Sequence, residues 1–186
     1  MIIGLTGYAQ SGKDTVAQTL VKHYGFTRVA FADKIRDYLY EMNPMIDSVV
    51  GEPIFLQSYI SRYGWEEGKK APHVRRLLQT TGVAARELFG ENFWVEQAFK
   101  DVRTAENIVV TDVRFKNEAD WIKNYEDSQI WRIKRLGVTA VNGHVSEHEM
   151  DEYQVDQIFT NNGTLEELEL LVKTRMMGYA KSTSKA

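Results

Sequence analysis

The amino-acid sequence predicts an α/β fold in which a parallel sheet is flanked by helices. Short apolar runs rich in β-branched residues alternate along the chain with segments whose apolar residues recur at helical spacing. A glycine-bracketed loop directly follows the first apolar run and directly precedes the first helical pattern. Strands that alternate with helices pair in parallel, because each helix returns the chain to the same end of the sheet.

The N-terminal part supplies the first two strand–helix pairs. Residues 2–6 are apolar and β-branched, and residues 13–24 carry apolar side chains at helical spacing. Residues 28–32 predict a second short strand. Asp33 is expected to cap the following helix, which Asn43-Pro44 ends.

The middle of the chain is expected to be helical. Residues 45–72 mix aromatic, charged and turn-forming residues, so we expect short helical pieces and loops there. A helix is predicted over 73–89, with Gly82 as an interruption, and a further helix over about 92–102.

The C-terminal part returns to strands and helices. The run at 108–111 is the clearest buried strand, and the alternation at 129–135 predicts another. Helices are expected at 117–125 and 165–177, with a last strand at 157–160 between them. Five strands are therefore expected in one sheet.

These elements predict a single domain over residues 1–180. Residues 136–155 are polar and are predicted to lie outside the core; this segment is called the polar excursion below. Residues 181–186 are expected to be a disordered tail. In a parallel sheet the ligand binds beyond the carboxyl ends of the strands. Functional residues are therefore expected directly after each strand.

Composition excludes several classes of function. The chain has 186 residues, a net charge of −3 and no cysteine. Disulfides, thiolate metal sites and cysteine nucleophiles are excluded, and the absence of cysteine fits a reducing cytoplasm. The acidic balance argues against a nucleic-acid partner, and no apolar run has the about 20 residues that span a bilayer.

The loop at residues 7–15, Gly-Tyr-Ala-Gln-Ser-Gly-Lys-Asp-Thr, has the context of a phosphate-binding loop, which predicts a P-loop NTPase fold. Its backbone N–H groups and the following helix N-terminus attract phosphate, and Lys13 adds a mobile positive charge. The residues expected to bind the phosphates are Gly7, Ala9, Gln10, Ser11, Gly12, Lys13, Asp14 and Thr15.

One residue departs from the common pattern. Asp14 stands where a Ser or Thr usually follows the lysine, and Thr15 comes next. A hydroxyl at position 14 therefore cannot hold magnesium as it does in switch GTPases. Thr15 is a candidate phosphate contact, and Asp14 acts either through a metal-bound water or as a helix cap. This arrangement favours small-molecule kinases.

Charged residues follow the later strands. Asp112, after the strand at 108–111, is a candidate for the Mg²⁺ shell together with Asp14 and Thr15, and the alternative is a helix cap or a surface ion pair. Arg114 could bind a phosphate bidentately, or else pair with Glu118. Arg135 opens the polar excursion and could neutralise the transferred group, or else be a surface charge.

A second set of polar residues belongs to the predicted helical middle. Arg36 is placed to meet the phosphate of an acceptor, with Asp33 and Lys34 beside it. Arg75 and Gln79 share a helix face, on which Gln79 could read a base edge, and Arg86 lies further along. Solvated helix charges are the alternative for this set. His144 and His148 have metal-like spacing without a third ligand, so a metal site there is not favoured.

These residues resemble a known family. The runs that carry the resemblance are Gly-Tyr-Ala-Gln-Ser-Gly-Lys-Asp-Thr, Ala-Phe-Ala-Asp-Lys-Ile-Arg, Leu-Gln-Thr-Thr-Gly, Thr-Asp-Val-Arg-Phe-Lys-Asn-Glu-Ala, Trp-Arg-Ile-Lys-Arg and Asn-Asn-Gly-Thr-Leu-Glu-Glu-Leu. In this order, from residue 2 to about 171, the chain is similar to bacteriophage deoxynucleoside monophosphate kinases. The last of these runs is shared with dephospho-coenzyme A kinases and discriminates poorly.

The resemblance implies an adenylate-kinase-like fold and ATP-dependent phosphoryl transfer to a dNMP. Residues 7–15 would bind ATP, and Asp112 and Arg114 would serve Mg²⁺ and phosphate. A helical region over about 36–90, including Arg36, would bind the acceptor. The excursion at 136–155 would act as a lid, with Arg135 on its side.

Two alternatives stay open at this point. One is another P-loop kinase, of the dephospho-coenzyme A or phosphomevalonate type, and the other is a nucleotide-binding regulator without transfer activity. The expected partners are small molecules, with no nucleic acid and no membrane. The expected location is the cytoplasm, which is the host cytoplasm if a phage encodes the chain. The sequence leaves the oligomeric state open, a homodimer being one alternative.

Overall fold

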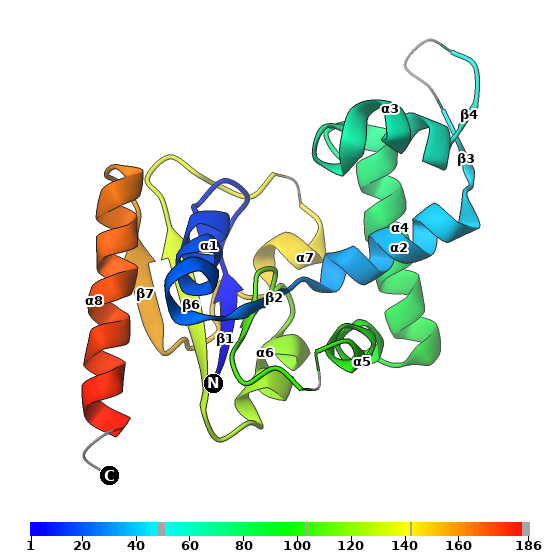
Figure 1. The fold of residues 1–186 in the computed structure, drawn as a ribbon. Coiled ribbons are helices and arrows are strands. Elements are labelled where there is room, and N and C mark those ends of the chain that lie inside the picture. The colour runs from blue at the N-terminus through cyan, green and yellow to red at the C-terminus, as the bar shows by residue number, and fades with distance from the viewer. Residues whose placement is uncertain (48–50, 103, 142, 184–186) are drawn as a thin grey trace. The chain divides into compact units, whose positions relative to one another are not determined.

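The computed structural model describes residues 1–47, 51–102, 104–141 and 143–183 (Figure 1). The chain divides into two compact units. The first consists of Met1–Ala30 and Asp101–Ala186, and the second is Phe31–Lys100. Each unit is described separately below.

A five-stranded sheet forms the centre of the first unit, and all its strand pairs are parallel. The strand order is β2-β5-β1-β6-β7, which places the N-terminal strand in the middle. The predicted fold class is thereby confirmed. The strands are β1 (Ile2–Thr6), β2 (Thr27–Val29), β5 (Ile108–Val110), β6 (Ser128–Lys134) and β7 (Gln157–Thr160).

Helices cover both faces of this sheet. On one face, α1 (Lys13–Tyr24) and α8 (Leu165–Thr183) share a core with Ile3 and Leu5 of β1. Gly4 faces the other side, where a Cβ would lie 2.8 Å from Ile130 Cδ1 and 3.0 Å from a methyl group of α6 (Lys116–Lys123). The alternation of side chains along β1 therefore buries one row under α1 and α8 and brings α6 close to the opposite face.

The polar excursion between β6 and β7 contains one short helix, α7 (Val145–His148). In the described ranges of the chain, no helix combines the length and apolar character needed to cross a membrane.

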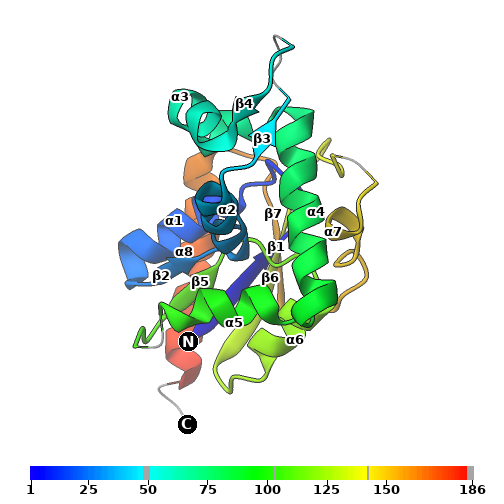
Figure 2. The same ribbon diagram turned by 90° about the vertical axis from the view of Figure 1, so that its right-hand side faces the viewer.

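The second unit is mainly helical (Figure 2). Its helices α2, α4 and α5 pack against one another, and α3 also packs against α2. Leu39, Leu56, Ile60 and Val74 are buried in its core. The elements of this unit are α2 (Phe31–Met42), β3 (Met45–Ile46), β4 (Ile54–Phe55), α3 (Leu56–Gly68), α4 (Pro72–Phe89) and α5 (Phe93–Lys100).

The second unit also corrects several sequence-based predictions. β3 and β4 form an antiparallel pair that was not predicted in the segment 45–72, of which residues 48–50 lie outside the described residues. Helix α2 begins at Phe31, so Asp33 lies in its first turn and is not its cap. Gly82 does not interrupt α4, which continues through it; Gly82 is buried where α2 comes close, and its carbonyl accepts a hydrogen bond from Trp94 Nε1 at 3.0 Å.

The predicted tail is wrong for residues 181–183, because α8 continues to Thr183. Residues 184–186 of that predicted tail lie outside the described residues.

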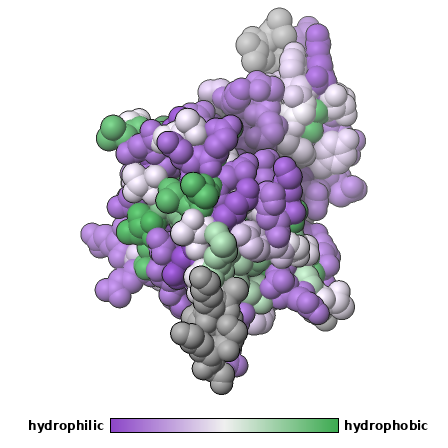
Figure 3. Space-filling model, turned by 60° about the vertical axis from the view of Figure 1, so that its left-hand side comes forward, coloured by the Kyte–Doolittle hydropathy of each residue, from purple (hydrophilic) through white to green (hydrophobic). Residues whose placement is uncertain are grey.

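Helix α8 has distinct inner and outer rows of apolar residues. Leu168, Val172 and Met176 recur every four residues and are buried against α1 and the sheet. On the outer side, Leu170 and Leu171 are 61% and 46% exposed, and Figure 3 shows hydrophobic side chains at the surface on this side. Burial therefore distinguishes leucines that are close neighbours on the same helix.

We predict that Leu168→Ala lowers the free energy of unfolding by about 2–5 kcal/mol, because a fully enclosed leucine leaves a cavity when it is truncated. The matched control Leu170→Ala should change that free energy by no more than about 0.5 kcal/mol, since its side chain is mostly in solvent. Urea unfolding followed by circular dichroism measures both values. Equal losses in the two variants would contradict this packing of α8.

Candidate functional site

The loop between β1 and α1 curls so tightly that two of its residues must be glycine. Gly7, Gln10 and Gly12 have φ angles of 134°, 64° and 110°. A Cβ at Gly7 would lie 2.3 Å from the carbonyl oxygen of Ile133, and one at Gly12 would lie 2.4 Å from Asn161 Nδ2. The loop is thus wedged between the end of β6 and the segment after β7. This geometry fits a phosphate cradle, in which backbone N–H groups must approach a ligand closely.

Lys13 folds back over this loop. Its Nζ donates to the carbonyl oxygens of Gly7 and Tyr8 at 2.7 and 2.8 Å, which places a positive charge at the start of the loop. The side chain of Ser11 is buried, and its Oγ has no hydrogen-bond partner among the described residues. Asp14 is exposed and Thr15 half-buried in the first turn of α1. The loop therefore carries polar groups suited to an anion.

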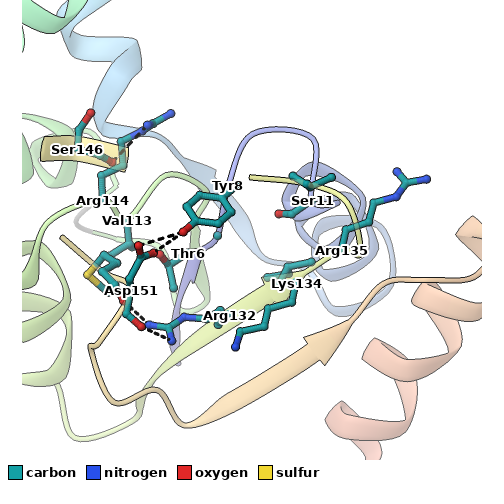
Figure 4. A pocket seen from close by; sticks show the side chains of 14 residues that line it. Thr6, Tyr8, Ser11, Val113, Arg114, Arg132, Lys134, Arg135, Ser146 and Asp151 are labelled. Atoms are coloured by element: carbon teal, nitrogen blue, oxygen red, sulfur yellow. Dashed lines mark hydrogen bonds between the residues drawn. The ribbon is translucent and has the colours of Figure 1, made fainter. Parts of the chain in front are cut away.

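A cavity of about 430 Å³ opens beside the loop (Figure 4). Four basic side chains and one carboxylate contribute to its lining, so its charge favours anionic ligands such as phosphates. The lining residues are Thr6, Gly7, Tyr8, Ser11, Val113, Arg114, Arg132, Ile133, Lys134, Arg135, Val138, Ser146, Met150 and Asp151.

Arg114 and Arg135, both predicted from the sequence, line this cavity from different sides. Figure 4 shows Arg114 reaching toward Ser146, and Arg135 reaching the other way beside Ser11. Arg114 Nη1 donates to the carbonyl oxygen of Ser146 at 3.5 Å. The backbone N–H of Arg114 donates to the buried Glu118 carboxylate at 2.7 Å, which fixes the segment after β5.

Asp112 lies two residues after the end of β5 and is half-buried, but it does not belong to the lining of this cavity. Its neighbours tie the segment to two strands, since Thr111 N donates to Val29 O at 2.9 Å and Val113 N to Leu5 O at 3.0 Å. Across the described part of the chain, no group of three His, Cys, Asp or Glu side chains could hold a metal ion. The role of Asp112 toward Mg²⁺ stays a prediction.

Arg132 is an important residue that sequence reasoning missed. Its guanidinium donates to the carbonyl oxygens of Met150, Asp151 and Tyr153, the last two at 3.0 and 2.9 Å. It therefore anchors the far end of the polar excursion to β6. Strand alternation places Arg132 on the face opposite Trp131, but nothing in the sequence reveals carbonyl partners about twenty residues ahead.

Tyr8 connects the excursion to the loop between β1 and α1. Its Oη donates to the Asp151 carboxylate, 3.0 Å from each oxygen, and His148 Nδ1 lies 3.3 Å from Asp151 Oδ2.

At the end of the excursion, Tyr153 Oη donates to Asp120 Oδ1 at 2.8 Å. Burial, followed by the hydrogen bond to the Asp120 carboxylate, raises the pKa of Tyr153, so its phenol keeps its proton and this bond beyond the pH at which an ordinary tyrosine ionises.

Asn161 supports the loop from the other side and was also missed. Its Nδ2 donates to the carbonyl oxygen of Ser11 at 2.8 Å in a buried position, and its backbone N–H donates to Lys134 O at 2.7 Å. Its neighbour Asn162 accepts a hydrogen bond from Leu136 N at 2.8 Å. Two adjacent asparagines at the carboxyl end of a strand are the sequence signal that could have identified this support.

The predicted acceptor-binding residues lie in the second unit, where only some of them come together. Arg36 Nη1 is 3.1 Å from Asp33 Oδ1, and Lys34 Nζ is 3.8 Å from Asp37 Oδ2. Two others lie far apart on α4. Arg75 Nε donates to the carbonyl oxygen of Lys69 and Arg86 Nη1 to that of Glu91, at 3.4 and 2.9 Å. Gln79 is half-buried in α4.

Comparison with known proteins points to one family. The family model described as deoxynucleotide monophosphate kinase matches residues 58–172. A curated relative from Acanthamoeba polyphaga mimivirus, named "Putative deoxynucleotide monophosphate kinase", is 30% identical over 190 residues, which cover 90% of this chain and 91% of the relative.

Solved structures share the fold at low sequence identity. The shikimate kinase from Aquifex aeolicus is 15% identical with a TM-score of 0.50, over 97% of this chain and 98% of that one. TT1252 from Thermus thermophilus is 16% identical with a TM-score of 0.51, over 96% and 97%. At these identities the likeness concerns the fold alone.

We predict that Asn161→Ala weakens ATP binding about tenfold, because the buried Ser11 carbonyl loses its partner and the loop loses its support. The matched control Asn162→Ala removes an exposed acceptor from the same turn and should have a clearly smaller effect. Titration calorimetry with ATP measures both dissociation constants. An unchanged dissociation constant in Asn161→Ala would show that the loop holds its shape without this contact.

Proposed function

The chain belongs to the deoxynucleotide monophosphate kinase family, and from this we propose that it transfers the γ-phosphoryl group of ATP to a deoxynucleoside monophosphate. The products are the deoxynucleoside diphosphate and ADP. The observation that carries the proposal is the glycine-wedged loop with Lys13 across it, beside a cavity lined by Arg114 and Arg135. Such a combination holds a triphosphate and neutralises charge on its outer phosphates.

The proposed reaction is a direct in-line displacement. An oxygen of the acceptor phosphate bonds to the γ-phosphorus of ATP, and the bond from that phosphorus to the β–γ bridging oxygen breaks. The acceptor phosphate is already anionic, so the chain needs no general base. Lys13, Arg114 and Arg135 would instead position the phosphates and offset their mutual repulsion.

Magnesium would accompany the ATP. Mg²⁺ keeps several waters and takes few protein ligands besides the phosphates, so the half-buried Asp112 and the first-turn residues Asp14 and Thr15 fit it as oxygen donors, directly or through water. When bound, the ion would supply charge neutralisation at the outer phosphates.

We also propose the acceptor residues and the setting. Arg36, with Asp33 and Lys34 beside it, would hold the acceptor phosphate, and Arg75, Gln79 and Arg86 of α4 would lie along the acceptor region. The resemblance to bacteriophage enzymes is the basis for proposing a phage-encoded protein that acts in the host cytoplasm, and the mimivirus relative supports a viral source in general.

An acceptor panel tests this function. We predict ADP formation from ATP with one or more deoxynucleoside monophosphates in a coupled assay that also contains the ribonucleotides and dephospho-coenzyme A. Lys13→Ala should lower turnover at least about 100-fold, because it removes a charge at the phosphates, while its urea midpoint stays close to wild type. Turnover with dephospho-coenzyme A alone would reject the proposal. ATP binding without turnover of any acceptor would indicate a regulator.

Arg36→Ala tests the acceptor site. We predict that it raises the KM for the accepted monophosphate about 10- to 100-fold, the range expected when a charge-assisted hydrogen bond is lost. The KM for ATP should change little, since Arg36 is assigned to the acceptor alone. Steady-state kinetics with each substrate varied in turn separates the two constants. Unchanged acceptor kinetics would place the acceptor phosphate elsewhere.

A further inference from the structure

Helix α3 is broken near its end by a single glycine. Gly64 has φ 71° and ψ 164° inside the helix, a conformation that residues with a Cβ avoid. The kink changes the direction of the chain directly before Trp65 and Glu66. Both residues then reach Arg36 of α2, which lies about thirty residues earlier in the chain.

Contacts hold the Arg36 guanidinium on several sides, but they do not use all of its N–H donors. Its guanidinium carbon lies 6.0 Å from the centre of the Trp65 ring, its Nη1 is 3.1 Å from Asp33 Oδ1, and its Nη2 is 3.4 Å from Glu66 Oε1. The side chain is only 19% exposed, and its buried Nε has no hydrogen-bond partner among the described residues. Nη1 and Nη2 each carry two N–H groups and have one carboxylate partner each in the described part of the chain, so the guanidinium still has donor capacity for an anion.

The Glu66 carboxylate bridges two cations. While Oε1 faces Arg36, Oε2 lies 2.5 Å from Lys69 Nζ. Glu66 itself is 73% exposed, so rotating its side chain into water costs little, and exposed ion pairs are weak. A phosphate dianion presents the same kind of oxygen acceptors to Arg36 and Lys69 with about twice the charge.

We propose that Arg36 and Lys69 together bind the acceptor's phosphate, and that Glu66 is the exchangeable counter-ion which this phosphate displaces. The inference rests on the proposed function and adds Lys69 and Glu66 to the acceptor site. Glu66 keeps the two cations close together and neutralised, and it swings out as the phosphate arrives. The acceptor phosphate therefore competes with a carboxylate of the chain itself.

The next residues in the chain provide a matched control. Glu67 and Lys70 have the same i,i+3 spacing, with Oε1 and Nζ 2.6 Å apart. Their side chains are 64% and 65% exposed, and this pair is not placed in the acceptor site. Substitutions there change net charge and helix pairing equally, without touching Arg36 or its partners.

Binding of a monophosphate to the full-length protein tests the proposal. For the deoxynucleoside monophosphate that the acceptor panel identifies, and for inorganic phosphate as a second probe, we expect Glu66→Gln to tighten binding about two- to fivefold, as for loss of a competing exposed ion pair. Lys69→Met should weaken binding of both probes about fivefold or more. Glu67→Gln and Lys70→Met should leave both dissociation constants unchanged. Titration calorimetry gives these constants, and acceptor KM should follow them while kcat stays nearly constant.

The outcomes separate this inference from the proposed function. If Glu66→Gln weakens binding, or if the Glu66 and Lys69 variants match their controls, the counter-ion proposal is overturned even when the panel shows kinase activity. If no monophosphate is turned over but inorganic phosphate responds to Glu66→Gln and Lys69→Met as expected, the anion site stands and the proposed reaction falls.

Discussion

The shape of the loop between β1 and α1 depends on close steric contact with neighbouring strands. Gly7 lies against the carbonyl oxygen of Ile133, and Gly12 lies against the amide of Asn161. Ile133 belongs to β6, which pairs with β1, and Asn161 directly follows β7 at the edge of the sheet. The strand order therefore sets the curvature of the loop and, through it, the direction of its N–H groups. Any ligand chemistry at this loop depends first on the packing of the sheet beneath it.

Basic side chains gather beside this loop, at the carboxyl ends of the strands. The ends of β5 and β6 bring Arg114, Arg132, Lys134 and Arg135 to one cavity, because parallel strands end on the same side. These four basic residues make different contacts. Arg132 is committed to three backbone carbonyls of the excursion, whereas Arg114 and Arg135 extend to opposite sides of the cavity. Arg132 thus holds the wall of the cavity in place, and Arg114 adds one further contact to the same segment at Ser146.

Much of this arrangement could be predicted from the sequence because its causes are local. Hydrophobic periodicity and the bracketing glycines identify β1, the loop and α1, and α1 spans residues 13–24 as predicted. The rule that ligands bind beyond strand ends placed Arg114 and Arg135 at the cavity. Arg132 and Asn161 were not predicted, because each acts through hydrogen bonds to backbone carbonyl groups that lie far away in the sequence. The lid and acceptor roles assigned from the resemblance remain predictions.

The second unit was harder to predict for a related reason. Its short antiparallel pair, β3 and β4, has too few residues for a periodic pattern, and the positive φ of Gly64 breaks a helix that composition alone would continue. The spacing of Glu66 and Lys69 predicts an ordinary surface pair. In the structure Glu66 follows the kink and also lies 3.4 Å from Arg36, so the same carboxylate neutralises a partly buried guanidinium. The contacts of Glu66 therefore depend on the backbone turn that precedes it. The conformation of Gly64 decides whether the Glu66 carboxylate is an ordinary surface charge or belongs to the proposed acceptor site.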